Sequence, residues 1–145
     1  MEKAKGSRAV GKIVLQTNCV SIFFDEPETL TIQWQRQIDY EERKEIFLWA
    51  RQFSMDHKVK NWLIDDEELY IMTTQEKEWI ENEWPELAAE AGLAKIVVYL
   101  PDYNFSSIQT LTDFTRRAQQ NYNRLGVTQH EVFTDYQTAL TWLAS

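Results

Sequence analysis

Hydrophobic and polar positions along the chain predict strands that alternate with helices. Runs rich in β-branched and aromatic residues, bounded by turn residues, are typical of strands. The run at residues 94–100 is almost continuously apolar, which is typical of a strand covered on both faces. The expected strands are residues 20–25, 29–34, 60–65, 94–100 and 130–134, with an additional extended piece at residues 13–16.

Helical spacing of apolar residues separates these strands. Asp39, or the residue beside it, is expected to cap a first helix, and Thr73 followed by Glu76 matches a capping box that would start a second helix near Thr74. Pro85 predicts a kink or break near Trp84, because proline lacks the helical donor. The expected helices are residues 40–57, 74–91, a third from Ser106 or Ser107 to Leu125, and 135–145 after a cap at Thr134 or Asp135.

The resulting order is β-β-α-β-α-β-α-β-α, which predicts an α/β fold. Strands alternating with helices favour a mostly parallel sheet, here five-stranded, with the strand at residues 20–25 antiparallel at one edge and helices flanking the sheet. The 145 residues suit a single domain. We expect that domain at residues 18–145, preceded by a basic and partly mobile lead-in at residues 1–17.

Composition indicates the kind of cellular compartment but does not indicate a reaction. The single cysteine, Cys19, excludes an internal disulfide framework and is expected to be a small buried hydrophobe in a cytoplasmic protein. No apolar run is long enough for a membrane span, and the charged first residues do not resemble a signal peptide.

Charge is unevenly distributed along the chain. Residues 1–12 carry four bases against one acid, a net charge of +3, so the remainder carries 11 bases against 22 acids, a net charge of −11. Residues 65–90 hold ten acids and the single base Lys77, which argues against a nucleic-acid surface there. The acidic segment is interpreted either as a solvated helix face or as a docking face for a basic protein partner.

Several of these stretches resemble a known family. The run "VKNWLIDDEELYIMTTQEKEWIENEWPELAAEAGLAKIVVYLP" and the later "EVFTDYQTALTWL" are similar to small bacterial proteins with the SpoIIAA-like (STAS) fold, in particular an uncharacterised branch. The likeness covers residues 18–144 and rests on a strand ending in Asp65, a helix carrying Trp79, Pro85 and Gly92, and the final "AL-WL". It implies a fold and says little about activity.

The resemblance also suggests a regulatory switch. In regulatory STAS proteins, a kinase phosphorylates a serine of an Asp-Ser-Ser/Thr-Gly sequence where the next helix starts. The equivalent place here reads "MTTQ", so the aspartate, the serines and the glycine are missing. Thr73 or Thr74 could carry a phosphate at the helix N-terminus, but the acids at residues 65–68 oppose it, and plain helix capping is the alternative.

Candidate chemistry is sparse. Asp65 and Asp66 lie at the carboxyl end of a parallel strand, where α/β folds bind ligands, but adjacent strand residues point to opposite faces. We expect Asp65 to bond loop N–H groups, with metal or acid/base roles as alternatives. His57 and His130 are not brought together by any pattern. No phosphate loop or hydrolase motif occurs, so no catalytic residue, metal site or cofactor is predicted.

The six tryptophans of the chain are the remaining feature that could indicate a binding surface. Trp79 and Trp84 lie five apart on one helix and cannot both face the sheet squarely. Either one is exposed as an anchor for a partner or a second copy of the chain, or both wrap the kink and stay buried.

We therefore expect a non-enzymatic STAS-like interaction module with a protein partner. Its candidate contact or switch residues are Asp65, Asp66, Glu67, Glu68, Thr73, Thr74, Trp79 and Trp84. The alternative is a small-ligand or lipid-binding domain with a crevice lined by Trp62, Trp79 and Tyr99, and an enzyme using Asp65 is a third hypothesis.

Overall fold

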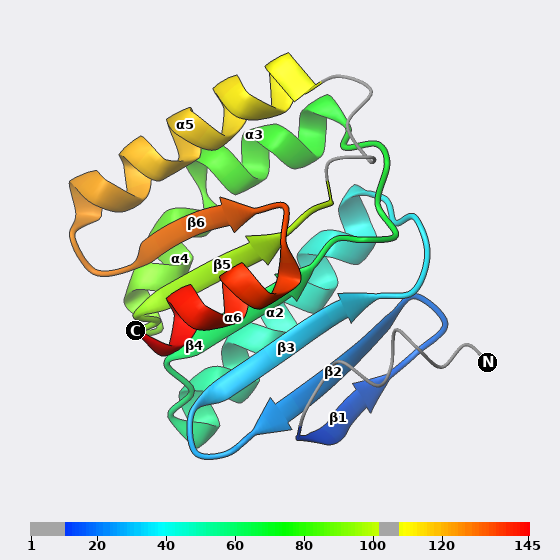
Figure 1. Ribbon diagram of the computed structural model, residues 1–145, viewed down its shortest axis with the longest axis vertical. Coiled ribbons are helices and arrows are strands. Elements are labelled where there is room, and N and C mark those ends of the chain that lie inside the picture. The colour runs from blue at the N-terminus through cyan, green and yellow to red at the C-terminus, as the bar shows by residue number, and fades with distance from the viewer. Residues whose placement is uncertain (1–10, 102–107) are drawn as a thin grey trace.

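The fold is a mixed sheet with helices on both faces (Figure 1). The computed structural model describes residues 11–101 and 108–145, without the side chains of residues 108–112. Helices α2, α3, α4 and α5 pack on one face and build the main core, whereas α6 packs on the other. The strands are β1 (Lys12–Gln16), β2 (Val20–Asp25), β3 (Thr29–Trp34), β4 (Asn61–Asp65), β5 (Lys95–Tyr99) and β6 (Gln129–Phe133). The helices are α2 (Tyr40–His57), α3 (Thr74–Asn82), α4 (Trp84–Glu90), α5 (Ile108–Leu125) and α6 (Tyr136–Ala144).

The predicted α/β fold class is confirmed, with one correction to the sheet. Within the described residues the sheet has six strands in the order β1-β2-β3-β4-β5-β6, not five. β1 pairs antiparallel with β2, and β2 antiparallel with β3, whereas β3, β4, β5 and β6 run parallel to one another. The strand at residues 20–25 is therefore not the edge strand, because β1 pairs with it and lies outside it.

The additional strand was expected only as an extended piece because its pattern is weak. It has five residues, directly follows the basic start of the chain, and none of its side chains is fully buried. Its pairing with β2 shifts register between Ile13 and Leu15, an irregularity typical of sheet edges. Hydrogen bonding to a neighbour, rather than local periodicity, fixes β1 as a strand.

Both predicted helix starts carry capping boxes. Asp39 accepts a hydrogen bond from the Glu42 backbone N–H, and the Glu42 side chain accepts from the backbone N–H of Asp39. The same exchange joins Thr73 and Glu76 at the start of α3. In each case the residue spacing satisfies N–H groups that the first helical turn leaves free.

The predicted break at the proline is confirmed. α3 ends at Asn82, and α4 begins at Trp84 with Pro85 in its first turn. In the first turn a backbone N–H has no acceptor within the helix, so the missing N–H of proline removes no helical hydrogen bond. Asp135 caps α6, one of the two residues expected there. The predicted start of the third long helix at Ser106 or Ser107 lies outside the described residues.

Aromatic rings fill the core between the sheet and α2, α3 and α4. Phe47 lies at the centre, with its ring 4.9 Å from Trp84, 5.7 Å from Trp62, 5.9 Å from Trp79 and 6.3 Å from Trp34. Trp79 and Trp84 are 3% and 1% exposed, so both are buried at the kink and neither is an exposed anchor. A continuous helix would point them apart, but the break between α3 and α4 turns both toward Phe47.

Candidate functional site

The end of β4 sends two carboxylates to opposite faces of the sheet. Asp65 Oδ1 accepts a hydrogen bond from the Glu67 backbone N–H at 3.0 Å, and its Oδ2 accepts from Gln33 Nε2 at 3.4 Å. This is the loop-bonding role expected of Asp65. Asp66 faces Arg43 and Trp34 on the other side of the sheet, and both aspartates are buried. The pair cannot share one proton or one cation, because strand geometry separates the side chains.

A buried ion pair lies behind Asp66 and joins α2 to α3. Arg43 Nε donates to Glu76 Oε2 at 2.8 Å, and the two side chains are 2% and 0% exposed. The guanidinium also lies 5.6 and 5.7 Å from the Phe47 and Trp34 ring centres. Glu76 thereby serves two purposes, since its other oxygen, Oε1, accepts from the Thr73 backbone N–H at 2.9 Å. Neither residue was predicted as part of a buried pair.

Burial raises the pKa of Asp66 to about 7. The positive charge of Arg43 and the indole of Trp34 oppose that rise, whereas the charges of Asp65 and Glu76 add to it. Asp66 and Glu76 thus lie near one guanidinium away from water, with Asp65 on the other face of the sheet. Asp66 is the member of this cluster that is held partly protonated at neutral pH.

A small cavity lies between this cluster and α5. Its volume is about 60 Å³, and its lining includes the polar residues Arg43, Asp66, Thr115, Tyr122 and His130 among apolar side chains. Among the described residues, Arg43 Nη2 has no hydrogen-bond partner. This volume is far below the 300 Å³ or more of typical ligand pockets.

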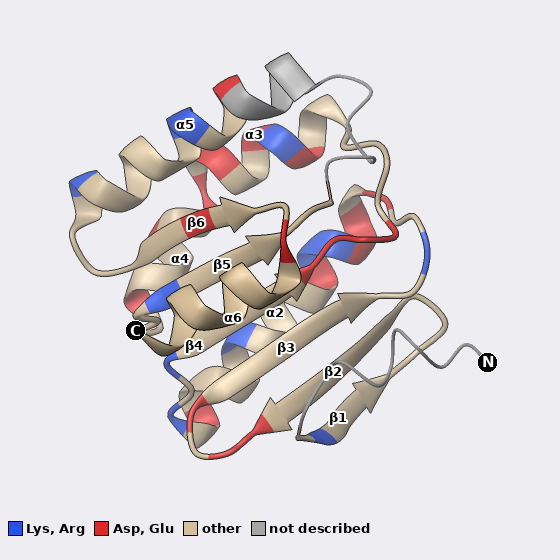
Figure 2. Ribbon diagram, in the orientation of Figure 1, with Lys and Arg blue, Asp and Glu red and all other residues tan. Residues whose placement is uncertain are grey.

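In the loop that follows, residues 66–73, one amide side chain bonds the backbone of the two exposed apolar residues. Gln37 Oε1 accepts from the backbone N–H groups of Tyr70 at 2.9 Å and Ile71 at 3.2 Å, and Gln37 Nε2 donates to the Ile71 carbonyl at 2.7 Å. Tyr70 and Ile71 are 56% and 67% exposed. The acidic start of the same loop lies at the carboxyl edge of the sheet, as Figure 2 shows for the segment after β4.

The structure places the eight predicted site residues in different environments. Glu67 and Glu68 are partly exposed, and Thr73 and Thr74 lie on the surface. Thr73 Oγ1 already bonds the Glu76 backbone N–H and its carboxylate, both at 3.1 Å, so its hydroxyl is engaged in capping. The remaining four, Asp65, Asp66, Trp79 and Trp84, are buried and cannot touch a partner.

The predicted crevice of Trp62, Trp79 and Tyr99 does not form. Trp62 and Trp79 belong to the main core on the α2 face, whereas Tyr99 packs against Tyr136 of α6 with ring centres 5.2 Å apart. Alternation along β5 causes this, because Tyr99 lies on the face opposite Ile96 and Val98.

The two histidines lie in different aromatic environments. His57 Nδ1 lies 3.0 Å from the Phe53 carbonyl at the end of α2, and the His57 ring stacks on Phe53. His130 stacks on Tyr122, and burial lowers its pKa to about 4, so it is neutral at neutral pH. Cys19 is buried. Among the side chains described, no three His, Cys, Asp or Glu groups converge in a way that would hold a metal ion.

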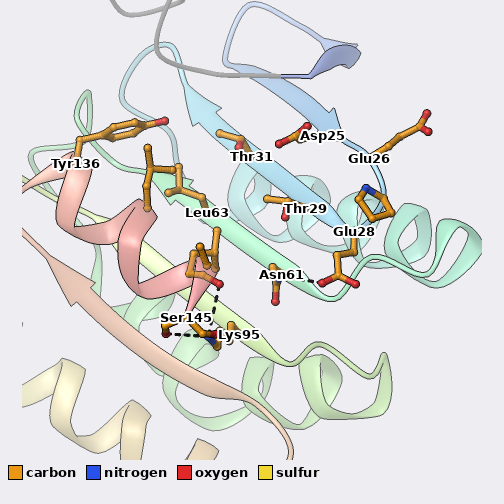
Figure 3. Close-up of a pocket in the computed structure, with 14 residues that line it drawn as sticks. Asp25, Glu26, Glu28, Thr29, Thr31, Asn61, Leu63, Lys95, Tyr136 and Ser145 are labelled. Atoms are coloured by element: carbon orange, nitrogen blue, oxygen red, sulfur yellow. Dashed lines mark hydrogen bonds between the residues drawn. The ribbon is translucent and has the colours of Figure 1, made fainter.

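A wider hollow of about 550 Å³ lies on the α6 face of the sheet (Figure 3). Its floor carries Thr31, Asn61 and Leu63, with the turn between β2 and β3 on one side and α6 on the other. Nothing in the sequence pattern pointed to this hollow, because it is formed by elements far apart in the chain.

Comparison with known proteins gives a likeness of fold. No family model and no curated protein matches the chain. One similar solved structure is that of an uncharacterised protein from Shewanella loihica PV-4, which belongs to the DUF3478 family and has a SpoIIAA-like fold. It is 16% identical, with a TM-score of 0.49 over 89% of this chain and 98% of that one. The fold that the sequence predicted is thus found in this neighbour, whose function is uncharacterised.

Within the part of the chain that the structure covers, every helix is too short or too polar to cross a membrane.

Proposed function

We propose that this chain is a non-enzymatic module that binds another protein through the loop at residues 66–73, together with the start of α3. The observation that supports it is the exposed pair Tyr70 and Ile71, held outward by the side chain of Gln37. Two adjacent large apolar residues on an ordered loop cost little entropy on binding, because their backbone is already fixed. Such exposed apolar groups commonly mark contact sites.

The loop also carries charge that favours a basic partner. Glu67 and Glu68 precede the apolar pair, and the exposed Glu78 follows on α3. Rim charges of one sign speed association with an oppositely charged surface and suppress wrong partners. The proposed surface is therefore narrower than the segment predicted from sequence, since it excludes the buried Asp65, Asp66, Trp79 and Trp84.

Photocrosslinking tests this surface directly. A photoreactive amino acid is placed at Ile71 and, in a matched control, at Val127, which is 50% exposed and far along the chain in the α5–β6 turn. In the protein's own cells, we expect a discrete crosslinked protein adduct from position 71 and none from position 127. The same adducts from both positions, or no adduct from either, would contradict the proposed surface, and an adduct of twice the chain mass would assign it to self-association instead.

A further inference from the structure

The small cavity between the sheet and α5 is lined by two hydrogen-bond donors that lack an acceptor. Arg43 Nη2 is buried and, within the described part of the chain, makes no hydrogen bond. The Trp84 indole N–H, which lies near the Tyr122 hydroxyl without completing a hydrogen bond to it, is a second such donor. Guanidinium and indole groups donate but cannot accept, and a buried donor without a partner is costly. The complementary occupant is therefore a hydrogen-bond acceptor.

The rest of the cavity wall is largely apolar. Phe47 from α2, Ile64 from β4, Ile96 from β5 and Phe114 from α5 contribute to it. An acceptor oxygen that is attached to a short apolar group contacts the donors and the apolar wall at the same time. A water molecule can satisfy only the donors.

The charges beside the cavity are already balanced. Arg43 Nε pairs with Glu76 Oε2 at 2.8 Å, and Asp66 lines the cavity as a second carboxyl near the same guanidinium. His130 is neutral, because burial lowers its pKa to about 4. A buried anion would add negative charge beside two carboxyl groups, and a cation would lie against the free N–H of a guanidinium. Since an unpaired buried charge is costly, these groups favour a neutral occupant.

The cavity is small and extends to the carboxyl edge of the sheet. Its volume of about 60 Å³ has room for about four water-sized groups, since one water molecule needs about 10 to 15 Å³ of such volume. Met72, in the loop after β4, and Leu100, directly after β5, line it and are only half-buried. Open α/β sheets bind their ligands at this edge.

We propose that this cavity binds a small neutral carbonyl compound, whose oxygen accepts from Arg43 Nη2 and whose apolar part lies against β5 and α5. The site is separate from the protein-contact surface at Tyr70 and Ile71 and does not depend on it. A ligand of about four non-hydrogen atoms binds with a Kd of about 40 µM at the tightest, so titration at millimolar concentrations covers the expected range.

NMR titration with three small molecules of the same planar shape tests the proposal. Acetone is neutral, acetate is an anion and acetamidinium is a cation. We expect acetone to shift the indole N–H signal of Trp84 saturably, while the indole signal of Trp142, on the opposite face of the sheet, stays unchanged. Preferential binding of either ion would overturn the proposal. No saturable response to any of the three would also overturn it and would leave a cavity for water alone.

Two variants test whether Arg43 is the donor. Arg43→Met/Glu76→Gln removes the guanidinium together with the charge of its partner and should weaken acetone binding about tenfold or more. Arg36→Ala, which breaks the exposed pair with Glu42, is the matched control and should bind acetone like the wild type. If the double variant fails to fold, Ala118→Val, which narrows the cavity from the α5 side, should abolish the response. Unchanged acetone binding in the folded double variant or in Ala118→Val would overturn the assigned site.

Discussion

At the residue scale, Glu76 explains why the start of α3 is rigid. One carboxylate oxygen caps the helix through Thr73, and the other pairs with Arg43 in the core. A buried ion pair adds little stability over an apolar pair, but removing one partner leaves an unpaired buried charge. The pair therefore fixes the position of α3 against α2 more than it raises the overall stability.

Replacing Arg43 by Met should destabilise the protein by about 3 to 5 kcal/mol, because Glu76 would remain charged and buried without its partner. The double variant Arg43→Met/Glu76→Gln should recover a large part of that loss. Urea unfolding measures both. Arg36→Ala, which removes an exposed partner of Glu42, is the matched control and should have a much smaller effect. Equal losses in the single and double variants would contradict the buried-pair account.

Asp66 should make stability depend on pH. Its pKa is raised from 3.8 to about 7 in the folded state, so the folded protein holds a proton that the unfolded chain releases. The stabilising effect of that proton is complete at acidic pH and is lost as pH rises toward 7. Compared with the wild type, Asp66→Asn should thus gain stability between about pH 4 and pH 7, by at most about 4 kcal/mol.

Thermal unfolding of both proteins across this pH range measures the difference. The exposed Asp56→Asn serves as the control substitution and should follow the wild type. A constant difference between Asp66→Asn and the wild type from pH 4 to pH 7 would show that Asp66 is not held protonated in the folded protein.

At the element scale, local sequence determines how α3 begins and ends. The Thr73 and Glu76 spacing and the position of Pro85 predicted both ends, because caps and prolines act within a few residues. The loop before α3 could not be predicted in the same way. Its shape depends on Gln37, whose amide reaches Tyr70 and Ile71 across more than thirty positions, and no periodicity records such a contact.

The two threonines at the helix start should differ in their contribution to stability. Thr73→Ala removes the cap and should cost about 1 kcal/mol, whereas Thr74→Ala at the first helical position should change stability by less than about 0.5 kcal/mol. Chemical denaturation compares them. Equal losses of stability in the two variants would contradict the capping role assigned to Thr73. Its hydroxyl would then be available as a modification site.

Gln37→Ala should loosen the loop without unfolding the domain. Three hydrogen bonds to the backbone of Tyr70 and Ile71 would be lost, so amide hydrogen exchange at both residues should become faster. Exchange in α3 should stay slow. Gln52→Ala on the exposed side of α2 is the control, and unchanged exchange in Gln37→Ala would show that the loop is held by other contacts.

At the scale of the whole molecule, the order of elements from β2 to α6 followed from the hydrophobic pattern together with turn, capping and proline residues. Details that depend on neighbours did not follow. β1 is a strand only because it pairs with β2, and Trp79 and Trp84 converge only through the break between α3 and α4. The hollow beside α6 is formed by four separate segments of the chain. Of the eight residues predicted as a contact or switch site, four proved to be buried, because burial depends on the packing of helices against the sheet.

The most direct test of the central claim is native mass spectrometry of the chain purified gently from its own cells, in parallel as wild type and as Ile71→Ser. We predict a stoichiometric protein partner on the wild type that is absent from Ile71→Ser, while Val127→Ser retains it. A wild-type spectrum that shows only the bare chain, or a partner that stays bound to all three proteins, would contradict binding through the Tyr70 and Ile71 loop.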